Sequence, residues 1–504
     1  MSFNLRKFIL IILIVGLTSQ AEAQIMNYYW NTNFNSVSSL LGGAVVAGEG
    51  DNTSIYYNPA TITEAEKGSN FSLTSSLFSY YIYNYKDALG DGINIYSDYF
   101  IAQPPFISYS YRPKNHKKLS ISAVLLTRVK EDINLTWANS KYYDVLQNLP
   151  GEERYNAMFA YRNYYLDTWG GIALAHRVIP AFSYGVSLFI SGATLKYHYN
   201  YATSAYSVND TLSPEFYPQS QRIAQGSYEE YIKFTDYRVI FKIGFLYKTG
   251  SWRFGLNITT PPIYVFSSGK NAIRSELVSN ISLSTDDFTP DFEIFDGQED
   301  DQLKTNFKLP FSVAVGFIKD FGDNKKRLYF TAEYFKSIKP YKMVDAEVRS
   351  DITDPDTYEQ LENKDWLSFA FATRSFVNVV VGYSWRIRKG REFLNSFRTD
   401  FSSIQNADLG VYKDYNTMKS LDYNRFHYSA GLKFNIKKSN FIAGGELTFA
   451  YKKNLKQVAN FTNPVEINIE DKRVLQGPLK EDMSVMYWGI SVYIGATLNF
   501  MKND

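Results

Sequence analysis

A long alternation of apolar and polar residues runs through the stretch SVMYWGISVYIGATLNF, residues 484–500. Every second residue from Met486 to Phe500 is apolar, and the positions between them are small or polar. A strand of a soluble sandwich usually has only about five or six residues. At ~3.3 Å per residue and a tilt of ~40°, this stretch crosses an apolar band of ~25 Å. Trp488 and Phe500 then fall near opposite ends of its apolar face, where the aromatic girdles of membrane barrels lie.

The same alternation recurs in 424–437 and in 234–248. In the second stretch Phe241 lies on one face, and Arg238 and Lys242 lie on the other. One face suits lipid, whereas the other suits a wet or ligand-filled lumen. A soluble sandwich must keep its inner face dry, so charges confined to one face of long strands favour a barrel in a membrane.

Alternation of this kind predicts fourteen strands, an even number, as single-chain bacterial barrels require. The fold class expected is therefore all-β, a 14-stranded antiparallel transmembrane β-barrel. The predicted strands are 71–83, 105–112, 118–130, 165–178, 181–197, 234–248, 251–260, 309–319, 326–337, 365–372, 376–388, 424–437, 440–452 and 484–500.

The predicted connections alternate in length, as short periplasmic turns and long external loops do in such barrels. A multidomain secreted β protein, the alternative, gives no reason for this alternation. The short connections are 112–116, 179–180, 249–250, 320–325, 373–375 and 438–439. The long ones are 84–104, 131–164, 198–233, 261–308, 338–364, 389–423 and 453–483.

The N-terminus has the pattern of a cleaved secretory signal over residues 1–23. Arg6 and Lys7 precede the apolar run Phe8–Leu17, which is too short to span a bilayer. Ala21-Glu22-Ala23 is an A-x-A cleavage site, so the mature chain is expected to begin at Gln24. We therefore expect export and an integral location in the bacterial outer membrane.

Composition narrows the chemistry. The 504 residues include no Cys, which excludes disulfides, a thiolate metal site and a lipid anchor on the mature chain. With 53 Lys and Arg against 51 Asp and Glu, the net charge of +2 predicts no nucleic-acid partner. The four His lie in no pattern that indicates a catalytic triad, so we expect no enzyme and no cofactor. They are His116, His176, His198 and His427.

Residues 48–60 read GEGDNTSIYYNPA, a cluster of turn formers ahead of the first predicted strand. This stretch resembles the N-terminal pattern of the FadL/TodX family of outer-membrane transporters of hydrophobic compounds, whose barrel also has fourteen strands. Hairpins such as 241–261 and 428–451 are similar as well. The resemblance implies a hatch at 24–70, inside a barrel at 71–500. The hatch motif is expected to comprise Gly48, Glu49, Gly50, Asp51, Asn52, Asn58, Pro59 and Ala60.

Local chemistry fits a hatch. Gly48 and Gly50 can take positive φ, the side chains of Asp51 and Asn52 can bond nearby amides, and Pro59 favours an extended residue before it. Three features depart from the family pattern. The spacer between Gly50 and Asp51 is missing, so the pattern is contracted. Thr61 stands where the family usually carries Gly, and predicted strand 118–130 has no Gly or Pro to mark the kink that opens the family's barrel wall.

Charged residues on the lumen-facing parity offer a candidate ligand site. Arg238, Lys242 and Arg253 are candidates to meet the carboxylate of a fatty-acid-like ligand, because burying that charge alone is costly. The alternative is mutual ion pairing inside a wet barrel. The acidic residues between 286 and 301 lack EF-hand spacing, so a solvated loop is expected there rather than a metal site.

These features together favour passive uptake of a hydrophobic small molecule by a monomeric barrel surrounded by membrane lipid. By resemblance the cargo is a long-chain fatty acid, captured between loops 198–233 and 261–308 and passed when the hatch shifts. A second hypothesis is a structural or secretion-associated barrel that docks a protein partner on its Tyr-rich external loops. A generic diffusion porin is disfavoured, because a hatch would obstruct a free aqueous channel.

Overall fold

The computed structural model describes most of the chain from Tyr28 onward, so the predicted signal peptide lies outside the described residues. Gly50 of the expected hatch motif also lies outside them. The described residues are 28–30, 34, 37–49, 51–65, 68–101, 106–113, 118–209, 211–217, 219, 222–282, 292–322, 325–346, 367–388, 390–404, 409–412, 415–419, 421–436, 439–471 and 473–500.

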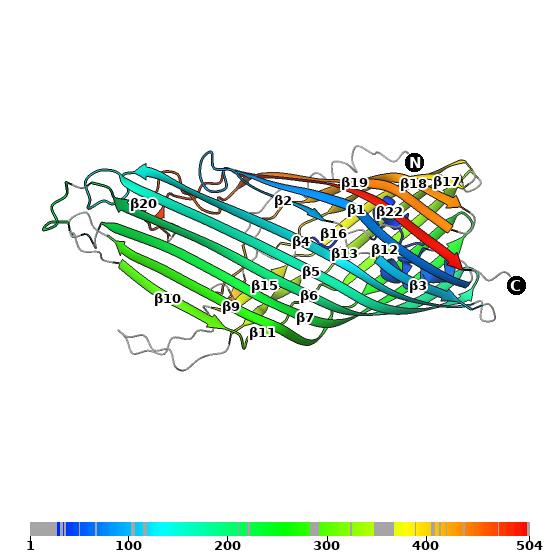
Figure 1. The fold of residues 1–504 in the computed structure, drawn as a ribbon. Coiled ribbons are helices and arrows are strands. Elements are labelled where there is room, and N and C mark those ends of the chain that lie inside the picture. The colour runs from blue at the N-terminus through cyan, green and yellow to red at the C-terminus, as the bar shows by residue number, and fades with distance from the viewer. Residues whose placement is uncertain are drawn as a thin grey trace.

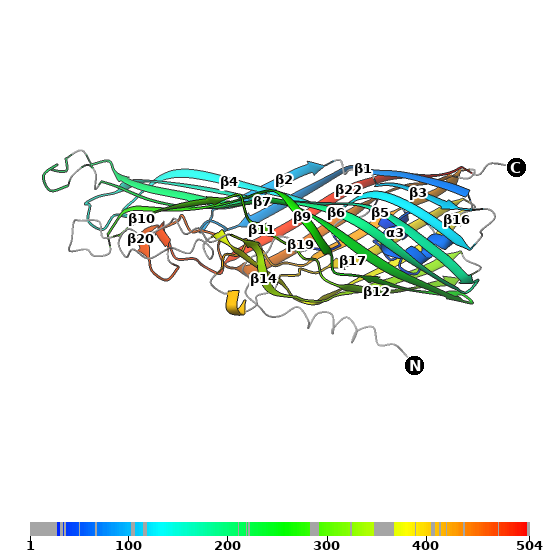
Figure 2. The same ribbon diagram turned by 90° about the horizontal axis from the view of Figure 1, so that it is seen from below.

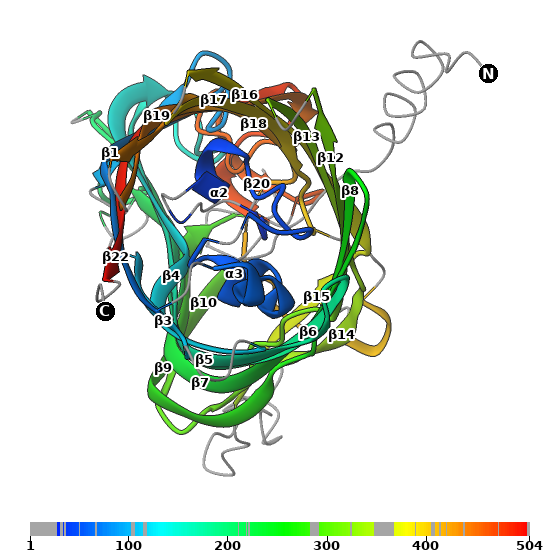
Figure 3. The same cartoon turned by 90° about the vertical axis from the view of Figure 1, so that its right-hand side faces the viewer.

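Fourteen antiparallel strands close a barrel, as predicted (Figures 1 and 3). The first and last strands pair directly from Ser69–Phe500 to Lys86–Ser484, which completes the ring. In order around the wall they are β1 (Gly68–Lys86), β3 (Phe106–Arg112), β4 (Leu119–Tyr143), β5 (Glu153–Ile179), β6 (Phe182–Ser207), β7 (Ile223–Thr249), β8 (Trp252–Thr259), β12 (Ser312–Phe321), β13 (Lys326–Phe335), β16 (Phe376–Arg388), β17 (Arg391–Asp400), β18 (Arg425–Ile436), β19 (Ser439–Leu455) and β22 (Met483–Phe500).

Side-chain burial alternates along the strands as predicted. On β5, Ile172 and Leu174 face outward with 59% and 52% of their surface exposed, whereas Ala173 and Ala175 face the lumen and are buried. An apolar outward face is stable only against lipid, because large apolar patches on a water-facing surface drive association. The alternation therefore places the wall in a membrane.

The wall is much taller on one side than the sequence predicted. β4, β5, β6 and β7 have 25, 27, 26 and 27 residues and continue through most of the predicted loops 131–164 and 198–233. Three further strands extend the sheet, β2 (Ile95–Ile101), β9 (Ile263–Ile281) and β10 (Phe292–Asp300). Of these, β10 reaches toward the left end of Figure 1 and Figure 2. The loop prediction was wrong here because strands beyond the membrane have polar outward faces and lose the apolar alternation.

Two predictions between 365 and 423 were wrong: one expected wall strand is not in the wall, and one wall strand was expected to be a loop. The total of fourteen strands was therefore unaffected. Residues 365–372 were expected in the wall, but β15 (Phe369–Thr373) pairs with β14 (Ile338–Asp345) in a separate three-stranded sheet. The wall strand β17 lies instead within predicted loop 389–423 and joins β16 to β18. All five residues of β15 are buried, because both of its faces pack against protein. A lipid-facing strand would have one exposed face.

The separate sheet carries an aromatic cluster. The sheet comprises β14, β15 and β11 (Lys304–Thr305). The ring centroid of Phe307 lies 5.5 Å from that of Tyr165 on β5 and 5.2 Å from that of Phe371 on β15. Asp236 on β7 fixes this segment by accepting from the backbone amide of Phe307 at 2.6 Å. The cluster therefore packs on the inner face of β5 and β7.

Helical structure is short. In the described part of the chain the helices are α2 (Val37–Leu40), α3 (Ser54–Tyr57), η1 (Pro59–Glu64) and η3 (Gly410–Tyr412). Among the described residues, none of the helices is long and apolar enough to cross a membrane. A hairpin of β20 (Val465–Asn468) and β21 (Arg473–Gln476) lies near the external end.

Candidate functional site

The N-terminal segment fills one end of the barrel. The described residues between 28 and 65, which include α2, α3 and η1, lie within the ring of strands in Figure 3. We call them the lumenal segment. Leu40 and Leu41 are fully buried and pack in a cluster with Ile318, Val380 and other wall residues. Because the wall supplies much of this core, the segment can fold there although it is short.

Asn58 joins the lumenal segment to the wall. Its Nδ2 donates to the carbonyl oxygen of Val46 at 2.6 Å and to that of Phe245 on β7 at 2.9 Å. Its Oδ1 accepts from the amide of Ala60 at 3.0 Å and so caps η1, where Pro59 is the first residue. Asn58 is extended, at φ −162° and ψ 105°, as the following proline favours. Each atom of this carboxamide therefore has a specific partner.

The remaining motif residues stabilise turns and contact the wall. Gly48 has φ +100°, a conformation that glycine adopts without strain. Asp51 accepts from the amide of Thr53 at 3.1 Å and from its hydroxyl at 2.5 Å. The Nδ2 of Asn52 donates to the carbonyl oxygen of Asn70 at 3.5 Å.

Glu49 forms the strongest ionic contact of the motif. Its Oε1 accepts from the hydroxyl of Tyr329 at 2.5 Å and from Nη1 of Arg327 at 3.2 Å, both on β13. Burial would raise the pKa of Glu49, but the Arg327 guanidinium, Lys433, the Tyr329 hydroxyl and Arg253 together outweigh burial and hold the pKa below its ordinary value. The carboxylate therefore stays ionised and tied to the wall.

Thr61 shows why the family's glycine is dispensable here. Its backbone does not take positive φ, so no glycine is required on conformational grounds. Its hydroxyl donates to the carbonyl oxygen of Asn58 at 2.8 Å, and the side chain is fully buried. A β-carbon at Gly48 would lie 3.2 Å from Cγ2 of Thr61, so the two residues pack closely.

Glycines in the wall make room for the lumenal segment. A β-carbon at Gly185 on β6 would lie 2.7 Å from the carbonyl carbon of Pro59, and one at Gly244 on β7 would overlap Oδ1 of Asn58. One at Gly255 on β8 would lie 2.7 Å from Cα of Ala47. These positions therefore allow the backbone of the segment to approach the wall closely.

The three basic residues predicted as ligand contacts all lie in the wall beside other protein groups. Arg238 donates through Nη2 to Asp167 at 3.1 Å and through Nη1 to the carbonyl oxygen of Phe307 at 3.0 Å. Lys242 donates to the carbonyl oxygen of Tyr56 at 2.8 Å, in the lumenal segment. The ion pairing that was the alternative thus applies to Arg238.

Arg253 also lies beside an acidic residue of the wall. Its Nη2 is 3.8 Å from Oδ2 of Asp320 in the next wall strand, near the short turns. Lys242 lines a small cavity of about 30 Å³ beside Tyr56, and none of the three predicted residues lines the larger cavity described next. Their role as carboxylate partners stays a prediction.

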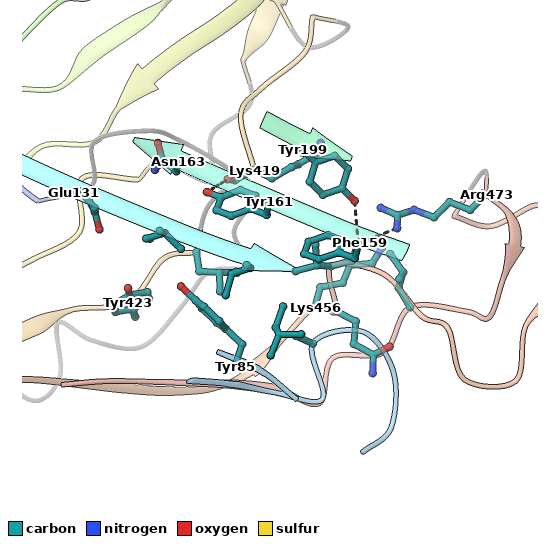
Figure 4. Close-up of a pocket in the computed structure, with 18 of the residues that line it drawn as sticks. Tyr85, Glu131, Phe159, Tyr161, Asn163, Tyr199, Lys419, Tyr423, Lys456 and Arg473 are labelled. Carbon is teal, nitrogen blue, oxygen red and sulfur yellow. Dashed lines mark hydrogen bonds between the residues drawn. The ribbon is translucent and has the colours of Figure 1, made fainter. Parts of the chain in front are cut away.

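A cavity of about 130 Å³ lies in the external half of the barrel (Figure 4). Its walls are mostly aromatic and aliphatic. In Figure 4, Phe159 and Tyr161 of β5 lie across from Tyr85 of β1, and Tyr161 donates to the carbonyl oxygen of Lys419. For scale, an apolar cavity of ~150 Å³ admits a benzene molecule. The lining side chains that carry charge are Arg425, Lys419, Lys456, Arg473 and Glu131.

Arg425 is fully buried at this cavity. Its Nη2 donates to Glu131 at 2.6 Å and to the hydroxyl of Tyr423 at 3.2 Å. Its guanidinium carbon lies 3.6 Å from the ring centroid of Tyr28 and 4.3 Å from that of Tyr487. Within the described part of the chain, Nη1 and Nε have no hydrogen-bond partner. A buried donor without a partner is costly, so these atoms mark a place for an acceptor.

The wall is interrupted beside the cavity. β3 pairs with β4 only from Ile107–Leu125 to Tyr111–Ile121, and β2 pairs with β1. Among the described residues β2 and β4 form no ladder; the hydroxyl of Ser97 accepts from the amide of Asn134 at 3.1 Å. A bulge at Arg128 shifts the register of β4 at the same level.

The cavity reaches the inner side of this interruption. Ile95 on β2 and Ile133 and Leu135 on β4 line the cavity. On the outer face, Tyr96 and Phe100 are 72% and 67% exposed and flank the interruption. A bulge bends a strand without Gly or Pro, so the absence of those residues in 118–130 did not exclude a local opening.

Comparison with known proteins establishes the architecture. A scan of family models and a search of curated proteins find no match. A FadL homologue from Pseudomonas aeruginosa has a TM-score of 0.55 at 12% identity, covering 96% of this chain and 100% of that chain. The P. putida toluene transporter TodX has a TM-score of 0.52 at 11% identity, covering 94% of this chain and 100% of that chain.

At such identities the likeness concerns the fold. The resemblance expected from residues 48–60 is confirmed at that level, because both structures span nearly the whole chain. The chain therefore has the fold of the FadL-type outer-membrane transporters, a closed 14-stranded antiparallel β-barrel.

Proposed function

We propose that the protein transports hydrophobic small molecules passively at the bacterial outer membrane. The observation that carries this proposal is the largely apolar cavity above the lumenal segment, next to an interruption in the wall. The lumenal segment fills the barrel end below the cavity, which argues against a free aqueous channel. The FadL homologue and the toluene transporter TodX have the same architecture.

The lining of the cavity favours a cargo with an acidic group. Four basic residues line it against one acidic residue, Glu131, which Arg425 already neutralises. The unpartnered Nη1 of Arg425 supplies a donor for a carboxylate, and Tyr423 and the other lining rings supply apolar contact for the adjoining carbons. A long-chain fatty acid is the first cargo to test, and the cavity would hold its carboxylate end.

The interruption suggests how such a molecule leaves. A hydrophobic molecule gains nothing by entering the aqueous periplasm, whereas moving sideways between β2 and β4 brings it to the upper edge of the apolar band, beside the lipid of the outer leaflet. Only the bond between Ser97 and the amide of Asn134 bridges the described residues of the two strands. Because no strand ladder closes the wall between the described residues of β2 and β4, we propose lateral release there.

Substitution of Arg425 tests the carboxylate site. Arg425→Lys keeps a positive charge beside Glu131 but removes the second arm of the guanidinium. We expect the purified protein to bind palmitate about 10-fold more weakly, because a hydrogen bond to a charged group contributes ~1.5–3 kcal/mol. Binding of the alcohol of the same chain length should stay unchanged. Calorimetric titration of both ligands in detergent gives the comparison.

Arg473→Lys is the matched control. Arg473 also lines the cavity, but its Nη1 already donates to the carbonyl oxygen of Val458 at 2.8 Å and to Gln476 at 3.1 Å. Unchanged palmitate binding in Arg425→Lys, or an equal loss for acid and alcohol, would contradict the carboxylate role. A stoichiometric protein partner and an empty cavity in the purified protein would support the docking hypothesis instead.

A further inference from the structure

The outward face of the tall wall changes from apolar to basic at one level. On β6 the outward residues run from Tyr184 through Ile190, which is 62% exposed, and reach Lys196. Lys196 lies directly opposite Tyr164 on β5 and Lys233 on β7. From Tyr184 to Lys196 the strand rises ~40 Å along its axis, or ~30 Å at a tilt of ~40°. The basic level therefore lies at the upper edge of the apolar band.

Three lysines gather at this level. Lys196 and Lys233 are paired residues on adjacent strands, and Lys130 on β4 lies one outward position lower, opposite Leu166. We call Lys130, Lys196 and Lys233 the lysine patch. Strands are ~4.8 Å apart and same-face neighbours ~6.6 Å apart, so along the wall Lys130 lies ~12 Å from Lys196 and ~16 Å from Lys233. Like charges directly opposite each other destabilise a sheet unless an anion lies between them.

The neighbouring acidic side chains are already engaged. Asp132 lies 3.5 Å from Arg162, and Glu229 lies 3.0 Å from His198. Throughout the described ranges, none of the three lysines of the patch forms an ion pair or donates to a carboxylate; Lys196 lies 5.6 Å from the ring centroid of Tyr164. The patch thus retains a net positive charge that the protein leaves open to an external anion.

Its surroundings indicate where that anion comes from. The hydroxyls of Thr194 and Thr235, 2.9 Å apart, lie one position below Lys196 and Lys233 on the lipid side. Tyrosines at this height are typical of the boundary between apolar core and headgroups. The lumenal segment and the short turns are at the opposite end, so this boundary belongs to the outer leaflet.

We propose that the lysine patch binds the phosphate groups of the phosphorylated glycolipid that forms the outer leaflet of the outer membrane. Lysine ammonium groups bind phosphate as point charges, and several acting together fix one headgroup. Acyl chains of the same lipid lie along the apolar outward residues below, such as Ile190 and Val186. Acyl and phosphate contacts together select a lipid over free phosphate. This inference goes beyond the transport proposal, because it concerns the outer surface.

The triple variant Lys130→Gln, Lys196→Gln, Lys233→Gln tests the proposal. A lysine near an anionic lipid surface contributes about fivefold to affinity, so three together predict about a 100-fold loss. The full mature protein is reconstituted in nanodiscs of zwitterionic lipid with increasing amounts of phosphorylated glycolipid, and bound glycolipid is counted by native mass spectrometry. We expect retention in the wild type and loss in the triple variant.

The control changes the same charge at the other end of the barrel. Lys118, Lys325 and Lys326 are exposed beside the short turns, and their replacement by Gln should leave glycolipid retention unchanged. Enzymatically dephosphorylated glycolipid should bind wild type and triple variant alike. Equal retention of intact glycolipid by wild type and triple variant would overturn the proposal. Competition by millimolar inorganic phosphate alone would assign the site to free phosphate and overturn it too.

Discussion

At the scale of residues, a few small or amide side chains determine how the lumenal segment meets the wall. Asn58 spans from Val46 to Phe245 through one amide group, while Gly244 beside it leaves the space that Asn58 occupies. Neither position tolerates a larger group, because the segment and the wall are separated there only by van der Waals distance. The function of Asn-Pro-Ala is thus to anchor the segment as well as to turn the chain.

Gly244→Val should displace the lumenal segment without unfolding the barrel. The added β-carbon would overlap Oδ1 of Asn58 and lie 2.8 Å from Cδ of Pro59, and overpacking of this kind costs ~1–3 kcal/mol. We expect several-fold faster cleavage of the segment by an added protease, and a higher ion conductance in planar bilayers.

Gly192→Val is the matched control on β6, because a β-carbon there meets nothing closer than 3.5 Å, at Cε1 of Tyr237. If both variants behave like the wild type, the close approach at Gly244 does not hold the segment.

Arg425 shows what residue patterns reveal and what they omit. It shares the lumen-facing parity of His427, so alternation alone indicates that it points inward. Tyr423 is two residues away, but its other partners, Tyr28, Glu131 and Tyr487, come from three distant parts of the chain. No spacing in the sequence links them, so the cavity could not be predicted.

At the scale of elements, the second and third wall strands decide whether the barrel is continuous. β1 pairs with β3 below and with β2 above, and only β3 continues the ladder to β4. The upper part of β4 therefore has one paired edge, toward β5, and one edge bridged by a side chain. Strand edges without partners are the positions where a sheet separates most easily.

A disulfide between β2 and β4 should block lateral release. The chain has no Cys, so Ser97→Cys combined with Ile133→Cys can form only the intended bond, provided the Cα atoms lie within ~7 Å. We expect oxidised cells to take up palmitate at a small fraction of the wild-type rate, and a reductant to restore it.

Each single cysteine variant serves as a control that cannot cross-link. Full uptake by a protein shown on a gel to be completely oxidised would exclude the route between β2 and β4.

At the scale of the whole molecule, the lumenal segment and the cavity are stacked along the barrel. The segment is held at the end with the short turns by bonds to several wall strands, including that of Arg177 on β5 to Glu64 at 2.6 Å. The cavity lies toward the tall wall, among β1, β4, β5 and β6. This order allows a ligand to reach the interruption without passing the segment.

A disulfide that holds the lumenal segment in place distinguishes lateral release between β2 and β4 from passage of the ligand when the segment shifts. The hydroxyls of Thr63 and Ser183 are 3.1 Å apart, so Thr63→Cys with Ser183→Cys should tie η1 to β6 when oxidised. If release is lateral, palmitate uptake should stay within about twofold of the wild type under oxidising conditions. Uptake that falls on oxidation and recovers on reduction would show instead that the ligand passes when the segment shifts.

The sequence by itself determined the class of fold. The period of two, the confinement of charges to one face and the alternating connection lengths indicate a membrane barrel, because lipid and lumen impose opposite demands on successive residues. The residues GEGDNTSIYYNPA indicated a cluster of turns, and only the family resemblance placed these turns inside a barrel. Only tertiary structure decided that β15 leaves the wall, that β4 to β7 continue beyond the membrane, and that β2 and β4 stay unpaired. These outcomes depend on contacts between distant segments, whereas periodicity reports only the local alternation of environment.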